Sequence, residues 1–308
     1  MWPALPYSEW QDTCTTLHLW TQIVGKIRLS LTPWINHSWQ ATLYVTSRGL
    51  TTGPIPCGER SFQLDFDFLH HLLQIRESRG GLRSIELRTR TVADFYATLM
   101  ARLAELHLQV SISTKPNELP EAVPFDHDRT HSTYEPDPVQ RFWRILELSE
   151  RVFTQFRSSF LGKVSPVHFF WGGFDLAVTR FSGRRAPLHA GGIPNLPDRI
   201  TQEAYSHEVS SAGFWPGNAA LPYPAYYSYA YPEPDGYRSA PVQPEGAIYN
   251  TELGEFLLPY DVVRTAPDPE RALLSFLDST YRAAADAGQW DCAALECAPG
   301  LPRVPRVP

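Results

Sequence analysis

The chain has 308 residues, of which 43% are hydrophobic and 19% are charged, and its formal net charge is −6. This length suits one large domain or two fused halves with a sizeable core. The acidic balance and the lack of a Lys/Arg run argue against a nucleic-acid partner. No stretch approaches the ~18 apolar residues of a membrane span and no secretory signal is present, so we expect a cytoplasmic protein without a membrane partner.

Cysteine and lysine are both scarce. None of the four cysteines forms a C-x-x-C pair, so neither a disulfide framework nor a zinc ribbon is expected. The basic residues are nearly all arginine, which we interpret as the codon bias of a GC-rich genome rather than an arginine-specific role. The lysines are Lys26, Lys115 and Lys163.

The first predicted element is a largely buried helix that is capped by Ser8 and stops at Pro33. Its one polar stripe consists of His18, Gln22 and Lys26, at i, i+4 and i+8 on a single face. Buried polar groups without partners cost about 1–3 kcal/mol each, so this stripe must find partners. The stripe either binds an anion or transfers protons as an acid or base, or it forms a polar seam in which its groups bond to the neighbouring sheet.

Strands and a second helix complete the first half. Thr91 with Asp94 is a capping-box-like start for a helix over 91–107. A proline-rich acidic segment, 114–137, is predicted to be an ordered connecting loop. The predicted strands span 39–47, 61–68, 72–77, 82–88 and 108–113.

The second half begins in the same way. Asp137 and Pro138 open a helix that runs to Gly162, and Asp268 opens a last helix that ends near Gly288. The tail over 298–308 is predicted to be disordered. The predicted strands of this half lie near 167–172, 174–181, 203–213, 225–231 and 246–258.

These elements predict an α+β fold, mainly antiparallel sheet with about four long helices, in one compact unit. The predicted parts are a helix–strands–helix half, a connecting loop, a second such half and a tail, over 1–113, 114–137, 138–297 and 298–308. Segments 36–50 and 167–183 both run His, Trp, strand, Val-Thr, Arg, Gly. An internal duplication would make His37 and His168 equivalent; a chance match is the alternative.

The strings LHLWTQIVGKIRL, SPVHFFWGGFDLAVTRFSGR and SHEVSSAGFWPG are long and unusual in composition. In them the chain resembles a bacterial family that is catalogued only as a domain of unknown function. The resemblance covers the chain from about Trp2 to Glu296. It implies a single full-length unit in a bacterial cytoplasm and carries over no activity, cofactor or catalytic residue.

Histidines beside aromatic residues are the leading catalytic candidates. His37 and His168 lie at predicted strand starts beside Trp39 and Trp171, where chemistry is common but a packed, hydrogen-bonded role is the alternative.

His207 and Glu208 are the other catalytic candidates. Adjacent strand residues point to opposite faces, so both would reach one pocket only through a bulge. A serine hydrolase is disfavoured, because no G-x-S-x-G elbow is present.

Charged residues of the 167–185 segment are predicted to bind ligand. Asp175 and Arg180 flank its hairpin, and Arg180 could hold a carboxylate or phosphate in a bidentate manner. An Asp–Arg pair that pins the sheet is the alternative. With His18, Gln22, Lys26, Trp39 and Trp171, these two residues form the predicted ligand-binding set.

A metal site is a weaker hypothesis. The string FDHDRTH gathers Asp126, His127, Asp128 and His131, but its two histidines would need a helix to share a face, and Pro124 favours a loop. A solvated connector is the alternative.

Together these features favour an enzyme that acts on a small polar or anionic molecule through a histidine-rich cleft. Two alternatives remain: a non-catalytic small-molecule binder whose pocket is walled by residues such as Tyr227 and Tyr229, and a partner-binding protein that exposes them. The sequence assigns no cofactor and no oligomeric state.

Overall fold

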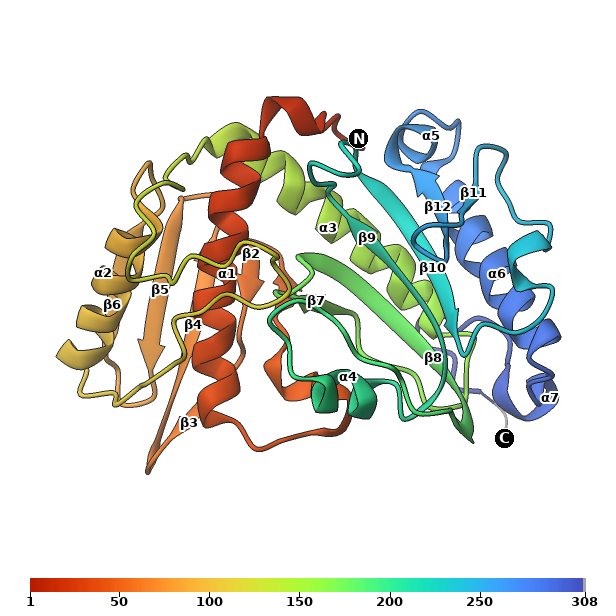
Figure 1. Cartoon of the computed structure of the whole chain (residues 1–308), viewed down its shortest axis with the longest axis horizontal. Coiled ribbons are helices and arrows are strands. Elements are labelled where there is room, and N and C mark those ends of the chain that lie inside the picture. The colour runs from red at the N-terminus through yellow and green to blue at the C-terminus, as the bar shows by residue number, and fades with distance from the viewer. Residues whose placement is uncertain (307–308) are drawn as a thin grey trace.

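The computed structural model describes residues 1–306 and confirms the α+β class (Figure 1). Its elements are two antiparallel sheets and helices that cover them. Among the described residues, no helix is both long and apolar enough to cross a membrane. The four longest helices are α1 (Gln11–Leu31), α2 (Val92–Glu105), α3 (Pro136–Arg157) and α6 (Pro269–Ala287).

The first sheet has the order β1-β2-β4-β5-β6, and β3 pairs with β4. Its strands are β1 (Tyr44–Thr46), β2 (Gly49–Thr51), β3 (Ile55–Cys57), β4 (Arg60–Asp67), β5 (Leu72–Glu77) and β6 (Leu82–Glu86). The second sheet has the order β11-β12-β10-β9-β8-β7. Its strands are β7 (His168–Phe170), β8 (Asp175–Arg185), β9 (His207–Trp215), β10 (Ala225–Tyr231), β11 (Ile248–Asn250) and β12 (Glu255–Pro259).

Short helices fill the connections. They are η1 (Tyr7–Glu9), η2 (Asn36–Ala41), α4 (Asp198–Ala204), η3 (Tyr237–Ser239), α5 (Tyr260–Arg264) and α7 (Cys292–Leu295).

The two sheets meet edge to edge at one backbone bridge. The N–H groups of Leu43 and Phe169 each donate to the other residue's carbonyl at 2.9 Å. This bridge places β1 beside β7 and joins the edges of the two sheets at one residue pair.

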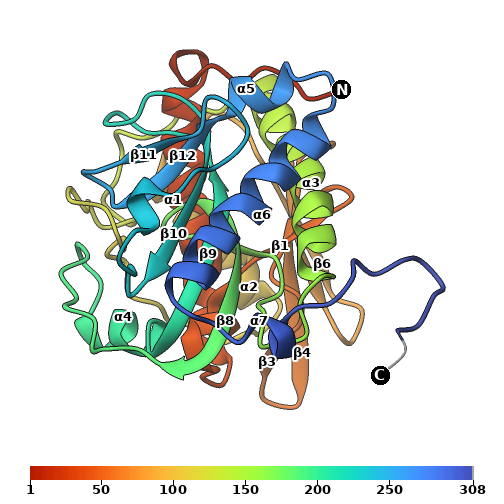
Figure 2. The same cartoon turned by 90° about the vertical axis from the view of Figure 1, so that its right-hand side faces the viewer.

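The second sheet separates an apolar core from a polar face. Helices α3 and α6 cover one side of this sheet (Figure 2). The residues Leu176, Val178, Phe214 and Tyr226 are fully buried on that side, where Tyr226 contacts Phe153 of α3. The Ser149 hydroxyl of α3 lies 2.8 Å from the Tyr226 hydroxyl on this side. Successive strand residues alternate between faces, so the neighbours of these residues point away from α3 and α6, towards α1, η2 and α4.

Several predicted helix limits are confirmed and others are wrong. Thr91 accepts a hydrogen bond from the Asp94 N–H, and Asp268 caps α6. The Ser8 cap is wrong, because Ser8 lies in η1 and α1 begins only at Gln11. The third helix begins at Pro136 instead of following Asp137, and it ends at Arg157, short of Gly162.

Three predicted strands are also wrong in part. The backbone of His37 and Ser38 is left-handed (φ 63° and 58°), so η2 replaces the start of the 39–47 strand. Helix α4 occupies the start of the 203–213 strand. Residues 108–113 alternate in burial but form no strand, because no neighbouring strand is positioned to supply backbone hydrogen bonds.

The segments that suggested a duplication do not superpose element by element. His37 lies in η2 whereas His168 lies in β7, and the matched Val-Thr pairs fall in β1 and β8. The two histidines therefore do not hold equivalent places, and a duplication stays a prediction.

The predicted tail falls partly within the described residues. Residues 298–306 are exposed, and a bridge joins Leu301 to Val304. Within this stretch the Gly300 N–H donates to the Ser158 hydroxyl at 3.0 Å. Residues 307–308 lie outside the described part of the chain.

Gly25 in the middle of α1 permits a close contact between this helix and the second sheet. A Cβ on Gly25 would lie 2.1 Å from the Trp171 ring. The Trp171 indole in turn donates to the Ala41 carbonyl at 2.7 Å, which joins β7, α1 and η2.

We expect Gly25→Ala to destabilise the protein by about 2–3 kcal/mol, because the added methyl displaces the Trp171 ring. Helix propensity alone predicts the opposite sign, since alanine is more favourable than glycine by about 1 kcal/mol within a helix. Denaturant unfolding measures the change. In a Trp171→Leu background the cost of Gly25→Ala should fall; an unchanged cost would contradict the contact.

Candidate functional site

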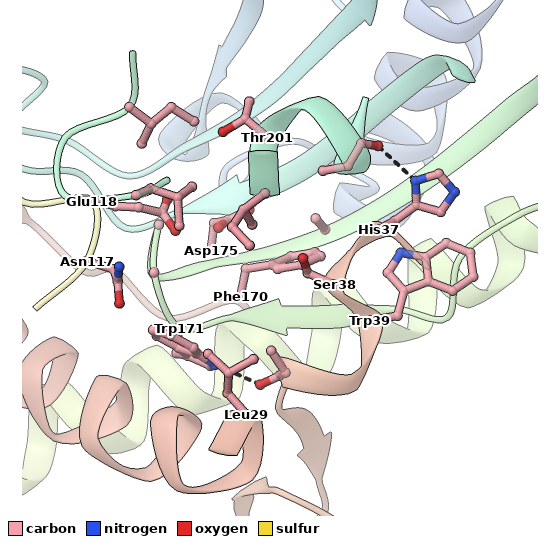
Figure 3. Close-up of a pocket in the computed structure, with 18 of the residues that line it drawn as sticks. Leu29, His37, Ser38, Trp39, Asn117, Glu118, Phe170, Trp171, Asp175 and Thr201 are labelled. Carbon is pink, nitrogen blue, oxygen red and sulfur yellow. Dashed lines mark hydrogen bonds between the residues drawn. The ribbon is translucent and has the colours of Figure 1, made fainter. Parts of the chain in front are cut away.

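A cavity of about 780 Å³ lies on the polar face of the second sheet. Its floor consists of residues from β8, β9 and β10, and its walls come from α1, η2, the 113–118 loop and the segment around α4 (Figure 3). The floor residues alternate along their strands, as the pleat requires. They are Asp175, Ala177, Thr179, Phe181, Val209, Ser211, Tyr227 and Tyr229.

Aromatic side chains form much of the wall. Trp39, Phe170 and Trp171 line the cavity, as do Trp34 and Tyr205. Trp39 and Trp171 belong to the predicted ligand-binding set, and both line the cavity, although Trp171 also has the structural hydrogen bond described above. A cavity of this size, walled by aromatic residues with a few polar groups, is typical of a small-molecule site.

The polar stripe of α1 faces this site, and its first two members hold its loops. The His18 Nε2 lies 2.8 Å from the Gly172 carbonyl in the β7–β8 turn. Burial lowers the pKa of His18 to about 4, so the ring is neutral and donates this bond. The Gln22 side chain accepts from the Asn117 N–H at 2.8 Å and donates to the Asn117 carbonyl at 2.9 Å. His18 and Gln22 are therefore a satisfied polar seam.

These two loops carry a pair of carboxyl groups. Figure 3 shows Glu118 and Asp175 beside each other, at the end of the cavity away from His37 and Trp39. A Cβ on Gly173 would lie 2.7 Å from Asp175 Oδ1 and 3.9 Å from Glu118 Oε2. Among the described residues, no ion pair includes either carboxyl group.

The carboxyl pair has raised pKa values. Burial, reinforced by the charge of Asp175, raises the pKa of Glu118 to about 7. Burial raises the pKa of Asp175 to about 6, against the effect of the Tyr227 hydroxyl, which donates to Asp175 Oδ2 at 2.5 Å. Burial likewise raises the pKa of a third acid, Glu255, to about 7, with a contribution from Asp175. Carboxyl groups tuned in this way can exchange protons near neutral pH.

A glycine in β9 makes the Tyr227–Asp175 hydrogen bond possible. Tyr227 pairs with Gly213, and Gly213 pairs with Ala177 on β8. A Cβ on Gly213 would lie 2.4 Å from the Tyr227 hydroxyl oxygen. The Tyr227 side chain therefore crosses β9 over this glycine to reach Asp175.

All three lysines lie at or beside the cavity. Lys26 and Lys115 line it, and only 7% of Lys26 is exposed. Burial alone lowers the pKa of Lys26 to about 8. The Lys163 ammonium donates to the His37 Nε2 at 2.5 Å and lies 4.7 Å from the centre of the Phe181 ring.

His37 is the predicted catalytic histidine that lines the cavity, but its ring nitrogens are both used. Nε2 accepts from Lys163, and Nδ1 donates to the Ala204 carbonyl at 2.8 Å. Its backbone N–H donates to the Glu203 carboxylate at 2.8 Å. His37 thus fastens α4 to η2, and burial lowers its pKa.

Two other predicted histidines lie behind or beside the wall. His168 is buried at 1% exposure behind Trp39, with ring centres 5.7 Å apart, and burial lowers its pKa to about 3. The His207 ring lies 6.1 Å from that of His37, and its Nδ1 is 3.1 Å from the Ser206 hydroxyl. The structure therefore does not bring His18, His37, His168 and His207 together in one cleft.

Two predicted site residues lie on the other face of the sheet. Arg180 is buried beneath the sheet, where its guanidinium donates to the Ser159 hydroxyl at 2.9 Å and to the Phe156 carbonyl at the end of α3. Glu208 accepts hydrogen bonds from Ser182 and Arg184. Strand alternation excludes both from the cavity, since each differs from the floor residues by an odd number of positions.

The FDHDRTH residues form a cap instead of a metal cluster. Asp128 Oδ1 accepts from the Thr130 and His131 N–H groups, and Oδ2 lies 2.7 Å from His131 Nδ1. The Asp128 carbonyl accepts from the Ala93 N–H at the start of α2. Asp126 and His127 are exposed, and residues 1–306 contain no cluster of three or more His, Cys, Asp or Glu arranged to hold a metal.

Glu118 is not predicted from the sequence as a site residue, because it lies in the 114–137 segment, which is predicted to be only a connecting loop. Its backbone is left-handed at φ 61°, as is that of Asn195 at φ 54° across the cavity wall. The two loops bind each other: the Glu118 N–H donates to the Pro194 carbonyl at 2.8 Å, and Asn117 donates to the Asn195 carbonyl. With His37 and Ser38, four non-glycine cavity residues adopt this uncommon conformation, which accumulates at functional sites.

Comparisons with known proteins identify a family and no activity. No curated protein and no solved structure gives a significant match to the chain. The model of a family of unknown function, DUF5996, matches residues 2–297, nearly the whole sequence. The chain belongs to the DUF5996 family.

Proposed function

We propose that the protein is an enzyme that transfers protons to and from a small polar molecule bound in the 780 Å³ cavity, with Glu118 and Asp175 as its acid–base pair. The observation that carries this proposal is the pair of carboxyl groups at the end of the cavity, where the described residues provide no cation to balance them. Acids that serve only structure are ordinarily paired or fully hydrogen-bonded.

The surroundings of the two carboxyl groups suit different roles. Asp175 accepts a hydrogen bond from Tyr227, which favours its ionised form. Glu118 has no such donor. Glu118 therefore keeps its proton to a higher pH than Asp175 does, which suits Glu118 as general acid and Asp175 as general base.

The fixed loops would hold this pair in place for reaction. His18 and Gln22 fix the turn before Asp175 and the residue before Glu118 through backbone hydrogen bonds. Helix α4 covers the site, fastened by His37. Such preorganisation is what separates a catalytic carboxyl pair from two adjacent acids.

A non-catalytic binder is the second candidate, and the aromatic walls favour it. Trp34, Trp39 and Tyr205 line the cavity, and they can bind an apolar body without chemistry. Tyr227 and Tyr229 face the same cavity, which does not favour the exposed aromatic patch that a partner-binding protein would require.

We expect Glu118→Gln and Asp175→Asn each to lower turnover by about 10²-fold or more, because each removes one proton-transfer group. A mass-spectrometric screen of small polar compounds identifies a turned-over substrate, and the variants are then assayed on it. Glu121→Gln, an exposed acid of the same loop, is the matched control. Full activity of Glu118→Gln would remove the acid–base role, and binding without any product would favour the binder.

We expect Glu118→Gln to become more stable than the wild type as pH rises. The folded pKa of Glu118, about 7, lies above its ordinary value of 4.5, so the native state loses stability as the carboxyl ionises across this window. The variant lacks this cost, and its advantage should grow from near zero at pH 4.5 to at most about 3 kcal/mol at pH 8. Thermal unfolding of wild type, Glu118→Gln and Glu121→Gln across this range measures it; parallel curves for the first two would contradict the raised pKa.

A further inference from the structure

We propose that the ligand of the cavity is dipolar, with a protonated amine held at Glu118 and Asp175 and an anionic group held at Lys26. The proposal rests on the cavity of the proposed function and names its ligand class. It requires no catalysis, so it can hold even where the enzyme assignment fails.

The first argument is the state of Lys26. Only 7% of the residue is exposed and it lines the cavity, and among the described residues it forms no hydrogen bond, ion pair or ring contact. Its Nζ is not among the buried polar atoms that lack a partner, so the ammonium group is accessible from the cavity while its stem is packed against protein. An ammonium group held in this way, with no counter-charge from the described residues, is a suitable partner for an anionic ligand group.

The second argument is the character of the acid end. Glu118 and Asp175 line the cavity, and Cβ positions at Gly172 and Gly173 would contact their carboxyl groups. The charge of Asp175 raises the pKa of both Glu118 and Glu255, and no described cation pairs with Glu118 or Asp175. Tyrosine rings lie over the same strands: Tyr227 and Tyr229 stack with centres 6.1 Å apart, and the Tyr205 hydroxyl lies 2.7 Å from that of Tyr229. Carboxylates beside aromatic faces are the usual surroundings of a bound ammonium group.

The third argument is that the two ends do not neutralise each other. Lys26 and the acid pair line one cavity, yet no ion pair joins them and no carboxyl charge contributes to the pKa of Lys26. A simple cation would leave Lys26 unpaired, and a simple anion would leave the acids unpaired. One molecule with both charges satisfies both ends.

Two further cations lie on the cavity wall in exposed positions. Lys115 and Arg199 line the cavity but remain open to solvent. Their charges are screened by water and salt, so they are less able than Lys26 to select a ligand.

Calorimetry at pH 7 with four probes of matched chain length tests the proposal: 6-aminohexanoate, hexylamine, hexanoate and 1,6-diaminohexane. Shorter amino acids, such as 4-aminobutanoate, then measure the separation of the two ends. The expected order places an amino acid about tenfold or more ahead of each singly charged probe and of the diamine. Tightest binding of the diamine or of the carboxylate, or no binding of any probe, would overturn the proposal.

Variants assign each end. Lys26→Met should remove the preference for the amino acid over hexylamine, whereas Lys26→Arg should retain it. Glu118→Gln should remove the preference over hexanoate. Arg129→Met and Glu121→Gln, at exposed positions, are the charge-matched controls.

The outcomes separate this inference from the proposed function. Charge-selective binding that depends on Lys26 and Glu118, together with no turnover of any compound, would support the dipolar ligand and refute the enzyme. Turnover of a neutral substrate that the amino acids do not inhibit would support the enzyme and refute the dipolar ligand. An unchanged preference in Lys26→Met would refute the role of Lys26.

Discussion

The site depends on one constraint: α1 is buried along most of its length and yet carries polar side chains. Gln22 is fully buried, and it meets this constraint by bonding both backbone groups of Asn117, much as a neighbouring strand would. His18, one turn earlier, bonds the Gly172 carbonyl. Because each unsatisfied group would cost about 1–3 kcal/mol, the helix fixes two otherwise irregular loops, and these loops carry Glu118 and Asp175.

The second sheet distributes charge between its faces. Along β8, Asp175 faces the cavity whereas Arg180 enters the core against α3. Along β9, Val209 faces the cavity whereas Glu208 bonds Arg184 on the far side. The same alternation that builds the core therefore keeps an obvious neutralising partner, Arg180, away from the acid pair, and this leaves the acids available to a ligand.

The chain has only three lysines, and all three lie at or beside the cavity. Lys26 and Lys115 line the cavity, and Lys163 binds His37 at its wall. An ammonium group loses its proton more readily on burial than a guanidinium group does, and its stem is more flexible. Because burial lowers the pKa of Lys26 only to about 8, its ammonium group stays mostly charged at pH 7 and can bind an anionic group in the cavity.

The sequence by itself determined the class of the fold, most of the long helices and the polar stripe of α1. These follow from local periods and caps: Thr91 and Asp268 begin their helices as predicted, and His18, Gln22 and Lys26 share one face as spacing requires. The alternation of side chains along a strand also predicts that Asp175 and Arg180, five positions apart on β8, point to opposite faces of the sheet. Local patterns thus predict which residues share a face.

Only the tertiary structure decided what each face meets. Glu118 lies in a segment without any periodic signal, and its place beside Asp175 depends on contacts with Gln22 and Pro194, which are far away in the sequence. The histidines were misleading for the same reason: His168 and His37 have the surroundings of catalytic residues in sequence, but packing buries the first and occupies both ring nitrogens of the second. Local spacing cannot encode such long-range pairings, because they arise only when separate elements pack together.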